Sequence, residues 1–249
     1  MIILKTSQEL SHMREAGRIA GGALAAGLEA CKPGATTMDV NRAVHHFITS
    51  HGAVPSFLGY GGFPASACVS VNNEVIHGIP SKKRVLREGD IVSIDVGALY
   101  KGHHGDTAAT IGVGSVSAEA QQLMDVTAKC LELGIAQAVK GNRIGDIGAA
   151  VQQYAESFGY GVVREFVGHG LGADLHEDPE VPNYGRAGRG PRLMPGMTIA
   201  IEPMINIVGE GVEVQPDGWT VLTASGSLSA HFEHSIAITD NGPVILTRP

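Results

Sequence analysis

The sequence has little of what marks secreted, membrane-spanning or nucleic-acid-binding proteins. Its 249 residues include three cysteines, Cys31, Cys68 and Cys130, an odd and widely spaced set that indicates no disulfide framework. No stretch approaches the roughly 20 apolar residues of a membrane span, and the N-terminus has neither a signal-peptide core nor a cleavage site. Basic residues are scarce enough that the formal net charge is −7, which disfavours a nucleic-acid partner. These absences predict a cytoplasmic protein with no membrane or nucleic-acid partner.

Common signatures of enzyme active sites are missing as well. There is no P-loop, no GxGxxG after a strand, no GxSxG and no HExxH. Cys68 stands in an apolar run, which favours a buried, inert thiol over a nucleophile. The one basic cluster, Lys82-Lys83-Arg84 with Arg87, is more typical of a solvated turn than of a binding patch. Any chemistry is therefore expected from residues that lie far apart in the chain.

Two helix pairs are predicted, one in each half of the chain. Thr6 opens a capping-box pattern, and apolar residues recur behind it at helical spacing. Asp39 and Gly52 recur as Asp146 and Gly159, each 107 residues later. A helix, a turn, a helix and a glycine are common in unrelated proteins, but the constant offset favours an internal duplication. The predicted helices cover roughly residues 6–31, 38–50, 118–139 and 144–158.

Strand-like stretches rich in Val, Ile and Thr follow each helix pair. Helices segregated from largely antiparallel strands indicate an α+β fold, an antiparallel sheet with flanking helices. No linker or low-complexity segment separates the halves, so we predict a single domain, residues 1–249, with pseudo-repeat halves of about 1–115 and 116–249. The predicted strands cover residues 67–71, 91–98, 105–113, 161–166, 198–204, 211–213, 219–223 and 230–239.

Two aspartates are predicted to converge from neighbouring strands. Asp95 lies within an apolar strand, where an unpaired charge is costly. If Lys101-Gly102 is a two-residue hairpin turn, Asp95 faces Ala108 across the hairpin. Asp106 is two residues from Ala108 and would then share the sheet face of Asp95 as a diagonal neighbour, roughly 7–8 Å away. A loop of odd length would instead place the two carboxylates on opposite faces.

The second half supplies the same kind of residue. Glu202 ends the apolar run MTIAIEP, Glu233 lies mid-strand in AHFEHSIAIT, and His169 stands among glycines that let the backbone approach a ligand. A lone buried acid is usually a satisfied structural group, but four on separate strands are hard to explain without cations. Four carboxylates balance two divalent cations, and one imidazole favours a borderline metal over calcium or magnesium. The five residues therefore predict a dinuclear site for metal-assisted hydrolysis.

Two more histidines are candidates because of the residues around them. His77 lies in NEVIHGIP and His176 ends GHGLGADLH, in each case beside glycines or a proline. The other histidines are assigned surface or packing roles. For His231 and His234, on either side of Glu233, a supporting role beside the metal ligands is the alternative.

Several longer motifs carry a resemblance to a known family. They are SFLGYGGFPASACVSVNNEVIHGIP, DIVSIDVGALYKGHHGDTAATIGVG, EFVGHGLGADLHEDPEVPNYG, PGMTIAIEPM and WTVLTASGSLSAHFEHSIAIT. Over essentially its whole length the chain resembles type I methionine aminopeptidases of the compact bacterial kind. The resemblance implies the pita-bread fold with pseudo-twofold symmetry. It also implies that the initiator methionine of nascent proteins is removed when the second residue is small.

The resemblance implies a role for each metal ligand. Asp95 would chelate one metal ion with both oxygens, while His169 and Glu202 bind the other. Asp106 and Glu233 would bridge the two ions, which cobalt, manganese, iron and zinc all fit. A bridging hydroxide would attack the scissile carbonyl, with Glu202 as the proton acceptor.

Substrate contacts follow from the same resemblance. His176 would hydrogen-bond the carbonyl oxygen as it becomes an oxyanion, and His77 would contact the scissile nitrogen. Asn72 and Ser229 would hold a monovalent cation. Aromatic rings and sulfur suit the unbranched thioether of methionine. The side chains that would wall the methionine pocket are Tyr60, Phe63, Cys68, Phe166 and Trp219.

Three alternatives are weighed against this interpretation. An Xaa-Pro aminopeptidase or prolidase shares the five ligands but usually carries an additional N-terminal domain, which this sequence does not show. A binding protein without activity would typically have lost ligands. A ribosome-interaction module is compatible with the enzyme, which the resemblance implies to be a monomer acting on nascent polypeptide N-termini. Phe57 and Leu175 stand where some relatives have cysteine and phenylalanine, and these departures would reshape only pocket walls.

Overall fold

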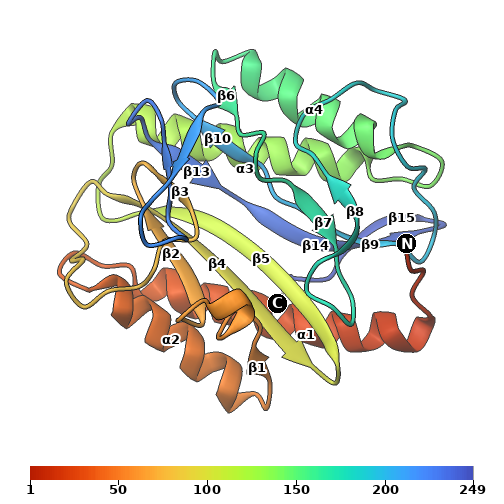
Figure 1. Cartoon of the computed structure of the whole chain (residues 1–249), viewed down its shortest axis with the longest axis horizontal. Coiled ribbons are helices and arrows are strands. Elements are labelled where there is room, and N and C mark those ends of the chain that lie inside the picture. Colours follow the sequence, from red (N-terminus) through yellow and green to blue (C-terminus); the bar gives the residue numbers. More distant parts are fainter. Residues whose placement is uncertain (249) are drawn as a thin grey trace.

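Four helices flank the sheets in two pairs (Figure 1). The computed structural model describes residues 1–248. Helices α1 (Ser7–Ala30) and α2 (Thr37–Ser50) lie together at the bottom of the view, and α3 (Ala118–Gln137) and α4 (Ile144–Glu156) lie together at the top. The four predicted helices are confirmed to within two residues at each end.

The helix starts explain why the two halves share landmarks. Thr6 caps α1 in a capping box with Glu9, whose backbone N–H donates to Thr6 Oγ1 at 3.3 Å. Asp39 and Asp146 each occupy the third position of α2 and α4 and accept a hydrogen bond from the backbone N–H of the capping residue. Both aspartates therefore satisfy a donor at the start of a second helix. This shared role fits the predicted duplication within one domain, which stays a prediction.

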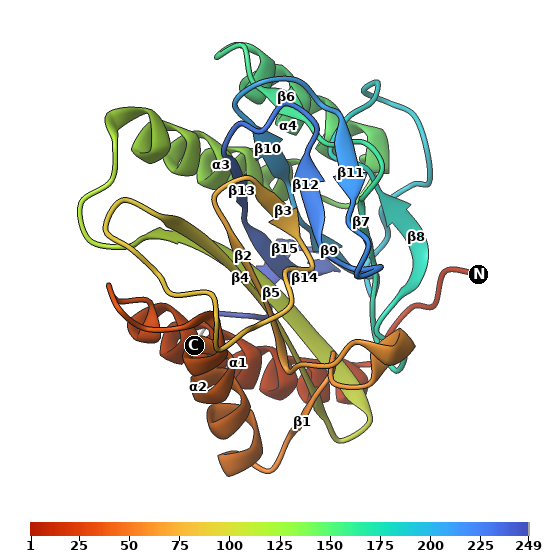
Figure 2. The ribbon, with the colours of Figure 1, turned by 60° about the vertical axis from the view of Figure 1, so that its left-hand side comes forward.

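Nine antiparallel strands form the main sheet, and two three-stranded sheets stand beside it. The strands are β1 (Val54–Pro55), β2 (Ala67–Val71), β3 (Glu74–Ile76), β4 (Ile91–Tyr100), β5 (His103–Gly112), β6 (Gly161–Val162), β7 (Gly168–Gly170), β8 (Glu177–Val181), β9 (Thr198–Ile201), β10 (Met204–Asn206), β11 (Val212–Val214), β12 (Val221–Thr223), β13 (Ser229–His231), β14 (Glu233–Thr239) and β15 (Gly242–Ile245). The main sheet has the order β1-β4-β5-β14-β9-β7-β8, with β2 paired to β4 and β15 to β14. The small sheets are β13-β10-β6 and β11-β12-β3, and β3 lies against β13 (Figure 2). The expected antiparallel α+β arrangement is confirmed.

Two predicted strands are interrupted in the structure. The stretch 198–204 divides into β9 and β10 at Glu202-Pro203, and the stretch 230–239 divides into β13 and β14 at Phe232. Proline has no N–H to donate to a ladder, which explains the first break. The backbone N–H of Phe232 donates to Pro203 O at 3.3 Å, so the two breaks lie side by side.

Other differences concern short strands. The predicted strand 161–166 is reduced to β6, because only its first two residues pair with β10. The strands that the sequence pattern did not predict are β1, β7, β8 and β15, each two to five residues long. Such short segments carry too few alternating positions for a pattern to be recognised.

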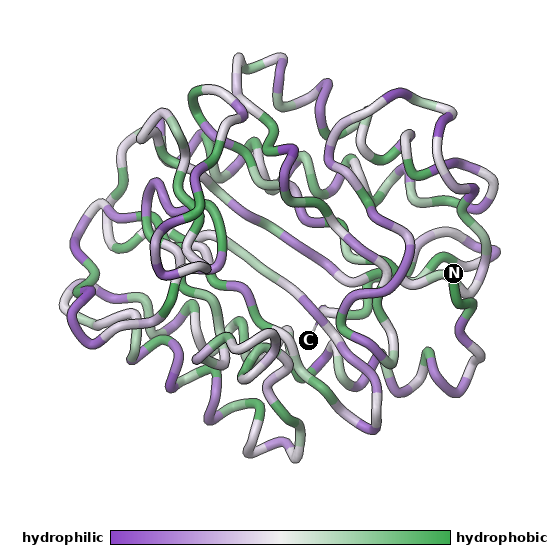
Figure 3. The backbone as a smooth tube through the Cα atoms, in the orientation of Figure 1, coloured by the Kyte–Doolittle hydropathy of each residue, from purple (hydrophilic) through white to green (hydrophobic). Residues whose placement is uncertain are grey.

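The core lies between the helices and the main sheet. Val44 and Ile48 of α2 pack with Val92 and Ile94 of β4, and all four are fully buried. In Figure 3 the lower helix α1 alternates between hydrophilic and hydrophobic stretches, as expected for a helix with one face against a sheet. None of the helices in residues 1–248 is long and apolar enough to cross a membrane.

Candidate metal centre

The predicted hairpin holds two of the candidate ligands. Tyr100 pairs with His103, so the loop has the two residues that the prediction required, and Asp95 pairs with Ala108. Lys101 and Gly102 have φ values of 49° and 76°, the positive angles of a type I′ turn.

Asp106, the second ligand of the hairpin, pairs with Gly97 on the opposite strand. Gly97 and Asp95 are two residues apart on β4, so both aspartates lie on one face of the sheet, as predicted.

A single row of residues crosses four strands at this level. Cys68 of β2 pairs with Asp95, Asp95 pairs with Ala108, and Ala108 pairs with Glu233 of β14. The small side chain of Ala108 therefore lies between Asp95 and Glu233 in this row and leaves space on that face of the sheet. The register of the sheet brings Glu233 to the aspartates across more than 120 residues of sequence.

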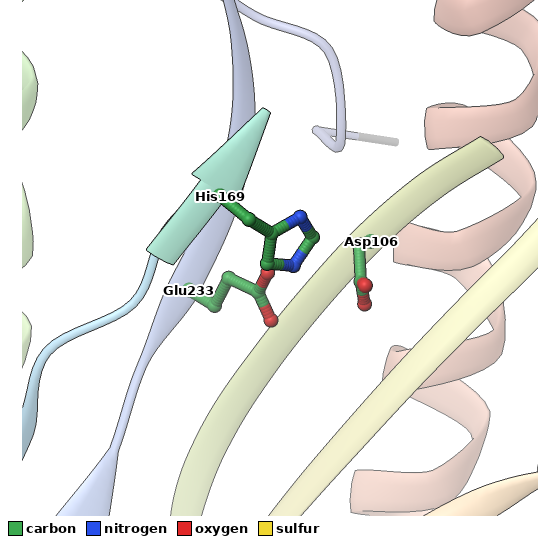
Figure 4. A group of neighbouring side chains, drawn as sticks. All are labelled: Asp106, His169 and Glu233. Carbon is green, nitrogen blue, oxygen red and sulfur yellow. The ribbon is translucent and has the colours of Figure 1, made fainter. Parts of the chain in front are cut away.

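His169 approaches this row from β7 (Figure 4), and Glu202 lies beside it. Figure 4 shows His169 on β7, Glu233 on β14 and Asp106 on β5 facing one space, and their ligand atoms all lie within 4.8 Å of one another. His169 Nε2 is 3.6 Å from Glu202 Oε1. His169 Nδ1 lies 2.9 Å from Gly170 O, to which it donates in the tautomer that leaves Nε2 with a free lone pair.

Burial raises the pKa of all four carboxyl groups. The pKa of Asp95 rises to about 7, and burial reinforced by the neighbouring carboxylates raises those of Asp106, Glu202 and Glu233 well above the usual range. Acids this close cannot all be charged unless cations compensate them. Asp95 Oδ1, Asp106 Oδ1 and Glu233 Oε1 are buried and have no hydrogen-bond partner. This cluster of unpartnered oxygens with one imidazole fits divalent cations.

His231 is a functional candidate for which the sequence pattern favoured a surface or packing role over a role beside the metal ligands. It is 1 % exposed, and its Nε2 lies 3.8 Å from Glu202 Oε2. Burial lowers the pKa of His231 to about 3, so the ring is neutral. Its Nε2 has no hydrogen-bond partner.

A cavity of about 200 Å³ opens beside the carboxylates. Phe63 is 3 % exposed and meets Trp219 edge-on with ring centroids 5.1 Å apart. Burial, with Asp95 and other carboxylates nearby, raises the pKa of the Cys68 thiol, which makes it a poor nucleophile. The five residues expected to wall the pocket all line this cavity, as do Asp95, Asp106, His169, Glu202 and Glu233. Phe57 and Leu175, which were expected to shape the pocket walls, also line it, and Ile76 and Val167 line it in addition to the expected residues.

His77 and His176 also line the cavity. His77 has φ 58° directly after β3, and burial lowers its pKa to about 4. Its ring lies edge-on to Phe166, with centroids 5.7 Å apart. The Nδ1 atom of His176 lies 2.7 Å from Tyr60 Oη, and burial lowers the pKa of His176. Both imidazoles are therefore neutral groups at the edge of the carboxylate cluster.

Asn72 and Ser229 lie together outside the cavity. The backbone N–H of Ser229 donates to Asn72 O at 3.0 Å. The Asn72 side chain is already engaged, because Nδ2 donates to Asp90 Oδ1 at 2.8 Å and Oδ1 accepts from Ile91 N at 3.0 Å. A monovalent cation at this place would therefore depend on backbone oxygens and the Ser229 hydroxyl, and the site stays a prediction.

Comparisons with known proteins agree with this geometry. The metallopeptidase family M24 matches residues 11–240. A methionine aminopeptidase from Clostridium acetobutylicum is 56 % identical over 99 % of both chains, and methionine aminopeptidase 1 from Bacillus subtilis is 50 % identical over the full length of both. The crystal structure of a methionine aminopeptidase from Thermotoga maritima matches all of both chains with a TM-score of 0.98 and 46 % identity. A prolidase from Pyrococcus furiosus matches with a TM-score of 0.80 and 25 % identity, over 99 % of this chain and 66 % of its own.

These matches confirm the expected pita-bread fold and the hydrolase class. The chain belongs to metallopeptidase family M24 and, within it, to the compact bacterial methionine aminopeptidases.

Proposed function

We propose that this enzyme removes the N-terminal methionine of newly made proteins when the second residue is small. The observation that carries this proposal is the apolar, aromatic and sulfur-lined cavity that ends against the carboxylate cluster. A methionine side chain is unbranched and polarizable, and such a lining matches it. The names of the full-length relatives support the same substrate.

The metal content follows from the charge of the cluster. We infer two divalent ions, which Asp95, Asp106, His169, Glu202 and Glu233 would hold. When bound, such ions supply Lewis acidity and lower the pKa of water. The unpartnered oxygens of Asp95, Asp106 and Glu233 support this assignment. Cobalt, manganese, iron and zinc all accept this mixture of ligands.

The remaining groups would bind the peptide and move protons. Glu202 is the proton acceptor for the attacking water, because its carboxylate lies within 4 Å of two neutral imidazoles and lines the cavity. His176 donates a hydrogen bond from Nε2 to the oxygen of the scissile carbonyl, while Tyr60 holds its Nδ1. His77 contacts the scissile nitrogen from the opposite wall. Phe63, with the other aromatic side chains, encloses the methionine.

The substrate places the enzyme where proteins are made. We infer a cytoplasmic monomer that meets nascent chains close to the ribosome. The exposed basic turn of Lys82, Lys83 and Arg84 is the surface to test for a ribosome contact. Co-sedimentation with ribosomes that falls with salt, and is lost on reversal of these three charges, would support that contact.

Three peptides test the function. Metal-stripped enzyme is given back manganese or cobalt and offered Met-Ala-Ser, Met-Leu-Ser and Ala-Pro-Ser. We expect rapid methionine release from Met-Ala-Ser, little from Met-Leu-Ser, and none from any peptide before the metal is restored. Cleavage of Ala-Pro-Ser instead would point to the prolidase branch of the family. Metal binding without any cleavage would indicate a binding protein.

A further inference from the structure

A buried ion pair joins the start of the chain to the loop that carries His176. Lys5 Nζ donates to Glu177 Oε2, and the two side chains are only 4 % and 6 % exposed. The other lysine, arginine and N-terminal ion pairs within residues 1–248 expose at least 43 % of each side chain. Burying two opposite charges often gives no more stability than a well-packed apolar pair. Stability alone is therefore a weak explanation for this pair.

Lys5 is also held in place by contacts other than the ion pair. Its backbone N–H donates to Gly196 O at 2.8 Å, and the next residue, Thr6, caps the long helix α1. Its ammonium group also donates to Ile3 O at 3.2 Å. These contacts hold the backbone and the ammonium group of Lys5 independently of Glu177.

Glu177 is the residue directly after His176 and the first residue of β8. Its Oε1 accepts a hydrogen bond from Asp174 N at 3.3 Å, and Gly172 N donates to Asp174 O at 3.0 Å. One carboxylate therefore joins Lys5 on one side to the loop 171–176 on the other. The loop begins two residues after His169 and ends with His176, so the position of the His176 backbone depends on its path.

The loop lies directly on the ion pair. A Cβ atom at Gly172 would lie 2.5 Å from Glu177 Oε1 and 2.8 Å from Lys5 Nζ, distances at which the pair would have to move. Only glycine lets the backbone pass this close to both charged groups.

We propose that Lys5 and Glu177 are a positioning pair for the reaction, which hold the backbone at His176 so that its ring faces the scissile carbonyl. Tyr60 fixes the ring through Nδ1 at 2.7 Å, and the ion pair fixes the chain from which the ring extends. Neither residue of the pair lines the cavity. This inference rests on the proposed role of His176 and extends it to residues outside the cavity.

The test replaces both charges together. The variant Lys5→Met/Glu177→Met leaves no unpaired buried charge, so it is expected to fold with a Tm close to that of the wild type. We expect kcat for Met-Ala-Ser to fall about tenfold, within the hundredfold that a misplacement of about 1 Å can cost, and KM to change less. Lys5→Arg keeps the charge and is expected to retain most of the activity. Lys140→Met, which breaks the exposed pair with Asp240, is the matched control and should leave kcat unchanged.

A second background shows whether the pair acts through His176. In His176→Ala enzyme the double replacement should cause no further loss, because the group that the pair positions is gone. The same tenfold loss in both backgrounds, or a normal kcat in the double variant, would overturn the proposal. All measurements use protein with its own N-terminus and equal metal content, so a loss of ligands is detected separately.

The proposal can fail independently of the function. If the wild type cleaves Met-Ala-Ser but the losses in the two backgrounds are additive, only the positioning role is wrong. If the wild type cleaves no peptide, the ring is followed directly by NMR of protein labelled with ¹⁵N-histidine, with His176 assigned from its loss in His176→Ala. Its signals should shift or broaden in the double variant, and unchanged signals would contradict the inference.

Discussion

The two sides of the metal centre are built in different ways. On one side, Asp95 and Asp106 belong to the β4–β5 hairpin, in which ten consecutive residue pairs keep one register. On the other side, Glu202 and Glu233 stand at the interruptions between β9 and β10 and between β13 and β14. A continuous ladder fixes the direction of every side chain along it, whereas a strand break leaves that direction to local contacts.

The interrupted side is held by single contacts from distant residues, whereas the hairpin is held by a continuous backbone ladder. Asn183 is fully buried, and its Nδ2 donates to Glu202 O at 3.0 Å. The backbone N–H of Phe232 donates to Pro203 O at 3.3 Å and joins the two breaks. The difference holds Asp95 and Asp106 in a fixed ladder and leaves Glu202 outside it, which suits the proposed role of Glu202 in proton transfer.

The largest effect is expected at Glu202. Replacing it with glutamine keeps the size and removes the proton acceptor, so kcat should fall by about 10²–10⁴-fold, the usual contribution of a general base. Steady-state cleavage of Met-Ala-Ser at several manganese concentrations measures this, because high metal compensates for a weaker ligand but not for a lost base. Glu213→Gln on exposed β11 is the control with the same chemical change. Activity close to wild type at saturating metal would remove Glu202 from proton transfer.

Much of the hairpin could be predicted from its sequence, and little of the interrupted side could. The apolar run around Asp95 and the Lys101-Gly102 turn specify a register by local rules alone, and that register is the one observed. Glu233 was expected in mid-strand but is the first residue of β14, because the break at Phe232 depends on contact with Pro203 from a distant segment. For the same reason Asn183 near Glu202 could not be recognised, and the sequence favoured a surface or packing role for His231. Both side chains lie near Glu202 only because separate segments of the chain come together in the fold.

A smaller effect should distinguish the two sides of the site. Removing a supporting hydrogen bond should lower activity on the interrupted side and only stability on the hairpin side. Asn183→Ala removes the donor to Glu202 O, and we expect activity or metal affinity to fall about 10- to 100-fold, as for other groups that orient metal ligands. The matched change on the hairpin is Ser93→Ala, which removes a buried bond of 2.8 Å to Thr110 Oγ1 two residues from Asp95. It should lower the free energy of unfolding by about 1 kcal/mol and leave kcat unchanged. Equal losses of activity in both variants would contradict the comparison.

The smallest effect concerns the hairpin without its metal ions. Burial raises the folded pKa of Asp95 to about 7, against 3.8 for the ordinary side chain. Between these values the folded metal-free protein keeps a proton on Asp95 that the unfolded chain has released, so the folded state binds more protons. The contribution of Asp95 to the stability of the folded state is therefore fully present below about pH 4 and is lost as the pH rises toward 7.

The buried histidines act in the opposite direction, and a difference between two proteins removes their contribution. His169 and His77 have folded pKa values of about 4, which makes stability rise with pH up to their ordinary value of 6.5. These contributions are shared by wild type and Asp95→Asn and cancel when the two metal-free Tm values are subtracted. We expect the difference to grow in favour of Asp95→Asn from pH 4 to 7, with about 2–4 °C for each kcal/mol in a chain of this size. Saturating manganese should reverse the sign, because the cation stabilises the charged carboxylate that burial disfavours. A difference that stays constant with pH would mean that Asp95 is ionised in the metal-free hairpin, and that the ladder alone, without a cation, compensates its charge.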